Sequence, residues 1–261
     1  GLKAVLHLRR RVLSSTLEQD IVLDAGSRRV DFITHVDWRE LHRLLKVEFP
    51  VAVDAAEGIN EIQFGYMQRP THRSRLYDSD RFEVSNQRYS ALCDGSHGAA
   101  VLNDCKYGIS MNGNALQLTL LRAAASPEMR ADHGRHRFTY AFTAWEGNFM
   151  ESPVVQEAYK LNVPMQVSEG SLESFSAFEV DAPNVFIDTV KPAEDGSGDI
   201  VLRMYEAKRA DTRCALSLNI PAARVWDCDM LENRQKELSS RDGKVDLTFH
   251  TFEVKTLRIA R

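Results

Sequence analysis

The chain has 261 residues, of which 43% are hydrophobic and 27% are charged, so it can bury a sizeable core. Its 33 lysines and arginines are outnumbered by 37 aspartates and glutamates, and a net charge of −4 argues against a nucleic-acid binder. With 14 glycines and 8 prolines, the composition also excludes a collagen-like or low-complexity protein.

Alternation of apolar and polar residues predicts β-strands along the whole chain. Residues 61–66 and 137–142 show this period of two clearly, and both are typical of half-buried strands. Turn signals such as Asp94-Gly95 and Asp195-Gly196 separate the strand-like runs, as in hairpins. Only residues 38–46 and 154–161 have helical spacing, over short lengths. We therefore expect antiparallel sheets and no doubly wound parallel sheet.

A polar stretch without a clear period, residues 163–174, is the best candidate for a domain boundary. The strand-like runs before it are more numerous than those after it. The predicted fold is all-β, with a large antiparallel β-sandwich over residues 1–166 and a smaller β-sandwich domain over residues 175–261.

The cysteines favour a reducing compartment. The chain contains Cys93, Cys105, Cys214 and Cys228, with no C-x-x-C pair and no histidine at zinc-finger spacing. We expect reduced thiols rather than disulfides or a zinc site. No run approaches the roughly 18 apolar residues of a membrane helix, and the first residues lack a signal-peptide pattern. The sequence thus predicts a soluble, cytoplasmic protein with no membrane partner.

Several long motifs in the same order identify a family. They are FGYMQRPTH at 64–72, GAAVLNDCKYG at 98–108, LTLLR at 118–122 and DHGRHRF at 132–138. Together with residues 30–50 and with the ending around 251–257, they resemble the C-terminal half of the zinc-dependent retaining α-mannosidases, glycoside hydrolase family 38. The resemblance covers nearly the whole chain.

This resemblance implies a galactose-mutarotase-like supersandwich followed by a smaller β-domain. In that family the catalytic acids and the zinc lie in an N-terminal α/β domain and a helical region, which this chain does not contain. We therefore expect a non-catalytic portion of an α-mannosidase, inactive by itself, with no catalytic residue, no metal ligand and no cofactor of its own. Its expected partners are the missing catalytic domain, carbohydrate and, in a homo-oligomer, a second copy of the chain.

Retaining hydrolysis needs two carboxyl groups about 5–5.5 Å apart, and no residue spacing here nominates such a pair. Acidic residues two apart, as in Asp78-Ser79-Asp80, are interpreted as solvated surface carboxylates. The close histidines His133 and His136, like His72, are interpreted as turn residues with structural hydrogen bonds rather than as metal ligands or bases.

The resemblance implies that Arg122 contacts substrate, and bracing of the sheet through Asp132 is the alternative role. The segment 103–108 carries amide, carboxylate, ammonium and phenol groups suited to gripping a sugar. Of the three tryptophans, Trp145 is the best candidate for a rim position where a sugar ring could stack.

Two other functions are compatible with the sequence. A free-standing carbohydrate-binding β-sandwich module would read glycans without cleaving them, and sugar binding by the isolated chain would favour it. A sugar mutarotase on the same sandwich would require a histidine and an acid that converge in one cleft, and the sequence offers no spacing argument for them.

Overall fold

The computed structural model describes residues 1–171 and 173–260, which form two compact units. The first unit contains residues 1–63 and 67–166, and the second contains Phe64–Tyr66 and the residues from Val167 onward. Every strand pair whose register is given is antiparallel, so the predicted all-β fold with a large and a smaller sandwich is confirmed. In the described residues, no helix is long and apolar enough to cross a membrane.

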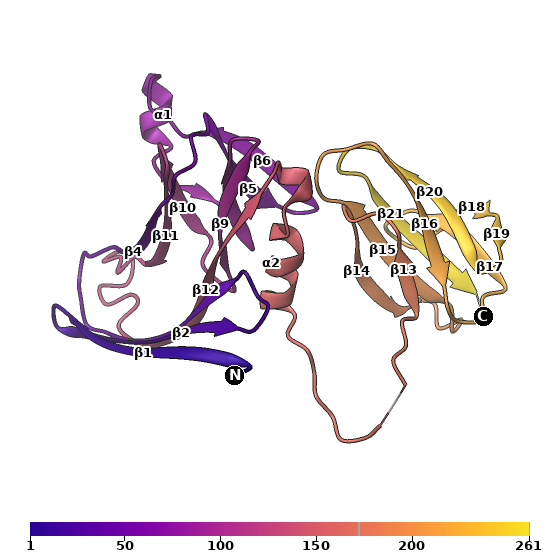
Figure 1. Cartoon of the computed structure of the whole chain (residues 1–261), viewed down its shortest axis with the longest axis horizontal. Helices are drawn as coiled ribbons and strands as arrows, with labels where there is room; N and C mark the ends of the chain where they lie inside the picture. The colour runs from indigo at the N-terminus through magenta and orange to yellow at the C-terminus, as the bar shows by residue number, and fades with distance from the viewer. Residues whose placement is uncertain (172, 261) are drawn as a thin grey trace. The chain divides into compact units, whose positions relative to one another are not determined.

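Two sheets form the first unit (Figure 1). The eight-stranded sheet has the order β1 (Lys3–Val12), β2 (Ser15–Asp24), β3 (Val30–Trp38), β12 (Gly134–Glu146), β9 (His97–Asn103), β8 (Tyr89–Cys93), β5 (Glu57–Ile62) and β6 (Gly65–Pro70). The four-stranded sheet has the order β4 (Leu45–Pro50), β11 (Ala115–Leu121), β10 (Gly108–Asn112) and β7 (Val84–Ser85). Side chains from both sheets share one core, in which Leu92 and Phe138 join Ile109, Leu116 and Leu118.

Helix α2 (Val154–Asn162) packs against β8 and β9 and confirms the expected helix at 154–161. Two arginines from the large sheet and its connections hold it there. The Arg29 guanidinium donates to the Glu157 carboxylate at 3.1 Å and to its carbonyl oxygen at 2.9 Å. The Arg88 guanidinium lies 4.0 Å from the centre of the Tyr159 ring. The helix is therefore tied to the sheet by charge as well as by its buried face.

Two predicted elements are wrong. Residues 61–66 are a hairpin rather than one strand, because Gln63 and Phe64 turn between β5 and β6. Residues 38–46 are not helical, since β3 ends at the buried Trp38 and β4 begins at Leu45. The intervening turn is instead fixed by Glu40, whose carboxylate accepts from the Ser14 amide and the Ser15 hydroxyl, both at 2.8 Å.

The second unit is the smaller sandwich. One sheet has the order β13 (Phe178–Val180), β16 (Thr212–Leu218), β20 (Lys244–Phe249) and β19 (Ser240–Arg241). The other has the order β14 (Val185–Pro192), β15 (Ile200–Glu206), β21 (Val254–Ala260), β17 (Arg224–Cys228) and β18 (Arg234–Leu238). Strand β20 shows the cause of the fold most directly, because Val245, Leu247 and Phe249 are buried while the residues between them are exposed.

An ionic network anchors the loop between β14 and β15, where the sequence predicted a turn at Asp195-Gly196. Arg258 on β21 donates to Asp195 at 2.5 Å through Nη2 and to Asp199 at 2.5 Å through Nε. Arg234 also donates to Asp199, at 2.8 Å, and its guanidinium lies 4.0 Å from the centre of the Trp226 ring. The loop is thereby tied to β21 and β18.

We expect the second unit to lose stability in acid through this network. The Arg258 hydrogen bond lowers the pKa of Asp195 to about 2. Burial acts against ionisation of Asp199, but hydrogen bonds from Arg258 and Arg234 outweigh it and lower the pKa of that carboxyl as well. A carboxyl group whose pKa is lowered by folding stabilises the fold at every pH above its ordinary pKa, near 4. This contribution disappears as the pH falls toward 2.

The measurement is urea unfolding between pH 5 and about 2, followed through the indole NMR signal of Trp226. The urea midpoint should fall through this window, and Asp195→Asn should flatten the fall. Asp246→Asn, which changes an exposed carboxylate of the same unit, is the matched control and should keep the wild-type slope. Equal slopes in Asp195→Asn and wild type would contradict the assignment.

Candidate functional site

A hollow of about 670 Å³ lies where β11 ends, at Arg122. Its wall includes His42, Leu44, Phe82, Glu83, Tyr107 and Arg122, and we call it the Arg122 hollow. Strands β7, β10 and β11 supply several of these residues or lie directly beside them in the chain. Two of the segments that the sequence analysis selected, 103–108 and 118–122, therefore meet in one place.

The backbone at Arg122 is held in a defined corner by Asp132. The Asp132 carboxylate accepts from the amides of Arg122 at 3.0 Å and Ala123 at 2.8 Å. Burial acts to raise the pKa of Asp132, but these two backbone hydrogen bonds outweigh it and hold that pKa below its ordinary value. Ala123 has a φ of 50°, a left-handed conformation that a residue with a Cβ adopts at a cost, so the corner needs these bonds.

Asp132 thus binds the backbone of Arg122 and not its guanidinium group. Arg122 is exposed, and its guanidinium makes no hydrogen bond or ion pair with any residue that the structure describes. Asp132 does not pair with the Arg122 side chain, as the alternative bracing role required, and binds the backbone amides of residues 122 and 123 instead. Contact of the guanidinium with substrate stays a prediction.

Aromatic rings and one carboxylate surround this arginine. Tyr107 is 57% exposed and Phe82 is 58% exposed, so both rings offer faces to a ligand. Glu83 accepts a hydrogen bond from the Thr119 hydroxyl and lies 3.6 Å from Lys46 Nζ. A Cβ on Gly108 would approach the Glu83 carboxylate to 2.9 Å, so the missing side chain at Gly108 makes room for it. Exposed rings beside a guanidinium and a carboxylate suit the faces and hydroxyls of a sugar.

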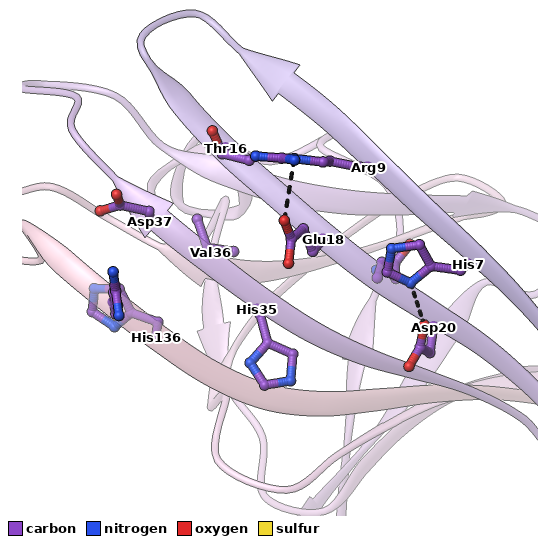
Figure 2. A pocket seen from close by; sticks show the side chains of 11 residues that line it. His7, Arg9, Thr16, Glu18, Asp20, His35, Val36, Asp37 and His136 are labelled. Atoms are coloured by element: carbon purple, nitrogen blue, oxygen red, sulfur yellow. Dashed lines mark hydrogen bonds and ion pairs between the residues drawn. The ribbon is translucent and has the colours of Figure 1, made fainter.

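A second hollow, of about 580 Å³, opens on strands β1, β2, β3 and β12 (Figure 2). Its charged side chains pair across neighbouring strands, as Figure 2 shows: Arg9 lies 3.1 Å from Glu18, and His7 lies 2.7 Å from Asp20. Exposed pairs of this kind contribute at most about 1 kcal/mol each. This surface is therefore a solvated sheet face, and its paired acids Glu18 and Asp20 are surface carboxylates.

The predicted rim position of Trp145 is wrong. Trp145 is only 4% exposed, and its indole donates to the Asn148 carbonyl oxygen at 3.2 Å. Strand β12 continues through it, and the residue opposite on β9 is Gly98. A Cβ at Gly98 would lie 2.1 Å from the indole, so the glycine creates the space that the ring fills. Trp38 is buried at 2% exposure, and Trp226 is partly covered by Arg234.

Other nominated residues have structural partners, except His133, whose ring Nε2 is buried without a hydrogen-bond partner among the described residues. His136 Nε2 lies 2.7 Å from the Asp132 carbonyl oxygen, and His72 Nδ1 lies 2.7 Å from the Ser74 hydroxyl. Asp78 differs from the expectation of a solvated carboxylate, because it is 7% exposed and bound by Arg75. Among the described residues, no group of three or more His, Cys, Asp and Glu side chains is arranged to hold a metal ion.

Comparison with known proteins identifies relatives over nearly the whole chain. A family model described as "Glycosyl hydrolases family 38 C-terminal domain" matches residues 1–130. A second, "Glycosyl hydrolases family 38 C-terminal beta sandwich domain", matches residues 184–257. The chain is 44% identical over 252 residues to "Alpha-mannosidase 2C1" of Homo sapiens and 35% identical over 255 residues to "Alpha-mannosidase G" of Dictyostelium discoideum.

These matches cover 94% of this chain but only 24% of the human relative and 23% of the Dictyostelium one, so the chain spans about a quarter of their length. Among solved structures, an α-mannosidase from Enterococcus faecalis V583 superposes with a TM-score of 0.80 at 18% identity. The superposition covers 94% of this chain and 29% of the bacterial one, and at this identity it supports the fold alone.

Proposed function

Because this chain belongs to the C-terminal region of glycoside hydrolase family 38, we propose that it is the non-catalytic C-terminal portion of an α-mannosidase, an enzyme that hydrolyses terminal α-mannosides. Its role is to support the active site built by an N-terminal catalytic domain and to line part of it. The observation that carries this proposal is the Arg122 hollow, where an exposed guanidinium with no partner among the described residues lies beside exposed aromatic rings.

In this role Arg122 and Tyr107 bind and orient the sugar. The guanidinium donates to sugar hydroxyls, the phenol ring covers an apolar face of the pyranose, and the same surfaces exclude water from the reacting bond. Asp132 fixes the direction in which Arg122 leaves β11, so the arginine is positioned before substrate arrives. Such remote contacts raise the rate of the chemical step only when they are stronger in the transition state than in the bound substrate.

The reacting groups themselves are assigned to the catalytic domain. Glu83 is the one carboxylate in the described wall of the Arg122 hollow, whereas retaining hydrolysis uses two about 5–5.5 Å apart. The family's zinc also does not fit this chain, because no three suitable side chains of the described residues converge on one point. In this proposal the zinc belongs to the N-terminal part.

Exposed apolar side chains near the Arg122 hollow support the proposed domain partner. Leu41 and Leu44 in the connection before β4 are 49% and 47% exposed, and Met129 in the loop after Arg122 is 74% exposed. Together with Phe82, they are candidates for burial against the catalytic domain. A second copy of the chain is the alternative partner that would bury these side chains. The proposed compartment is the cytoplasm, and the free thiols of all four cysteines support it.

The proposal predicts an isolated chain with no glycosidase activity and little affinity for sugar. We expect no turnover of an aryl α-mannoside and no saturable heat in calorimetric titration with mannose, since the hollow supplies one wall of a subsite. The second candidate, a free-standing carbohydrate-binding module, is favoured by the two exposed rings beside Arg122. It predicts millimolar or tighter binding of mannose that Arg122→Met weakens. Chelator-sensitive turnover by the isolated chain would contradict both.

A further inference from the structure

A smaller hollow of about 130 Å³ lies on the first unit, apart from the residues that form the Arg122 hollow, except for a shared Val84. Its wall includes Arg69 on β6, Arg81 in the connection between helix α1 (Leu76–Asp80) and β7, and Met111 on β10. We call it the Arg69–Arg81 hollow. Two guanidinium groups therefore face a cavity that is large enough for a small ligand group.

Within residues 1–171 and 173–260, neither guanidinium group has an acidic partner. The Arg69 guanidinium donates to the Ser85 carbonyl oxygen at 3.2 Å and contacts Met67 Sδ at 3.9 Å, and both acceptors are neutral. The Arg81 guanidinium lies 5.4 Å from the centre of the Tyr77 ring. Among the described residues, neither arginine forms an ion pair, since the carboxylate of the wall, Asp78, pairs with Arg75 and His72. Burial, together with the positive charge of Arg81, lowers the pKa of Arg69, as expected when like charges share a partly buried site.

The carboxylate in the wall of this hollow, Asp78, already forms an ion pair with Arg75. Asp78 is 7% exposed and accepts from Arg75 three times, through Nε at 3.0 Å, Nη2 at 3.2 Å and the amide at 3.1 Å. These bonds oppose the effect of burial and lower the pKa of Asp78. Arg75 therefore balances the charge of Asp78, and the positive charge of Arg69 and Arg81 stays uncompensated within the described part of the hollow.

We propose that the Arg69–Arg81 hollow binds a small oxyanion, a carboxylate or a phosphate group. An oxyanion between the two guanidinium groups removes their mutual repulsion and accepts charge-assisted hydrogen bonds from both. The planar fork of arginine matches the oxygens of carboxylate and phosphate. Met67, Val84 and Met111 give the same hollow an apolar side, where the carbon skeleton that carries the oxyanion can lie. This site is independent of the proposed sugar-contacting role of Arg122.

The test is titration of the chain with inorganic phosphate and, separately, with acetate, at constant ionic strength set with sodium chloride. Binding is followed through the side-chain NMR signals of the arginines. We expect saturable chemical-shift changes at Arg69 and Arg81. The dissociation constant should be at least about tenfold larger in Arg69→Gln and in Arg81→Gln than in wild type. Arg73→Gln changes an exposed arginine outside the wall of the hollow and should bind like wild type.

Two sources of the oxyanion are distinguished by the same data. Tighter binding of phosphate than of acetate supports a phosphorylated small molecule, and equal or tighter binding of acetate supports a carboxylate side chain of a protein partner. Arg69→Lys keeps the charge and serves as a second variant if Arg69→Gln does not fold. Shifts that do not saturate, or the same affinity in wild type and in both glutamine variants, would overturn the proposal.

Discussion

Replacing Arg88 with methionine should destabilise the first unit by about 3 kcal/mol, because it leaves the buried carboxylate of Glu61 without its counterion. Glu61 is 2% exposed, and the Arg88 guanidinium donates to it at 2.6 Å through Nη2 and at 3.1 Å through Nε. The substitution also removes the stacking of Arg88 on Tyr159, which holds α2. Urea unfolding at neutral pH measures the loss.

The pH dependence of this loss identifies its cause. Burial raises the pKa of Glu61, and the hydrogen bonds from Arg88 offset only part of that rise. A raised carboxyl pKa means that the folded state holds the proton more tightly, so stability falls as pH rises from the ordinary value through the raised one. Without Arg88 the pKa of Glu61 rises further, so the pH range over which stability falls extends to higher pH. The loss of unfolding free energy in Arg88→Met should therefore be smallest in acid and grow toward neutral pH.

Two variants separate the stranded charge from simple loss of a side chain. Glu61→Gln combined with Arg88→Met removes the charge and should recover part of the stability. Arg137→Met, which changes an exposed arginine of β12, should cost less than about 0.5 kcal/mol. A deficit that is independent of pH, or a double variant no more stable than Arg88→Met, would contradict the role given to Glu61.

The sequence predicted the sheets well because a strand's burial pattern is local. Strand β20 alternates buried and exposed residues along its whole length, and that alternation is visible in the amino acids themselves. The same local reasoning failed where a turn interrupts an alternating run, as at Phe64. It also failed at residues 38–46, where Trp38, Leu41 and Leu45 have helical spacing although Trp38 ends β3, Leu41 is exposed and Leu45 begins β4.

Contacts between distant segments were beyond such reasoning. Arg122 and the segment of Tyr107 were nominated separately, but their meeting in one hollow and the presence of Phe82 there depend on the pairing of β10 with β7 and β11. The Glu61 and Arg88 pair is 27 residues apart and has no sequence signature. Trp145 was misplaced because its burial depends on the glycine opposite it, Gly98, on another strand.

Arg122 should matter to catalysis although it carries none of the chemistry. Under the proposed function, Arg122→Met in a polypeptide that joins this chain to the proposed catalytic domain should lower kcat/KM for an aryl α-mannoside by about 10- to 100-fold, the effect of losing hydrogen bonds from a charged donor. Arg122→Lys keeps the positive charge without the planar guanidinium, so its kcat/KM should lie between those of wild type and Arg122→Met. Arg130→Met, on the same exposed loop but outside the hollow, should leave kcat/KM unchanged.

The decisive measurement is therefore kcat/KM of the polypeptide that joins this chain to the proposed catalytic domain, wild type and Arg122→Met, with zinc content and unfolding temperature measured on the same samples. A fall of at least about tenfold with zinc content and stability unchanged is the expected result, and it would place the Arg122 hollow at the sugar. Equal kcat/KM in the two proteins would contradict the account, because this part of the chain would then support the fold without reaching the substrate.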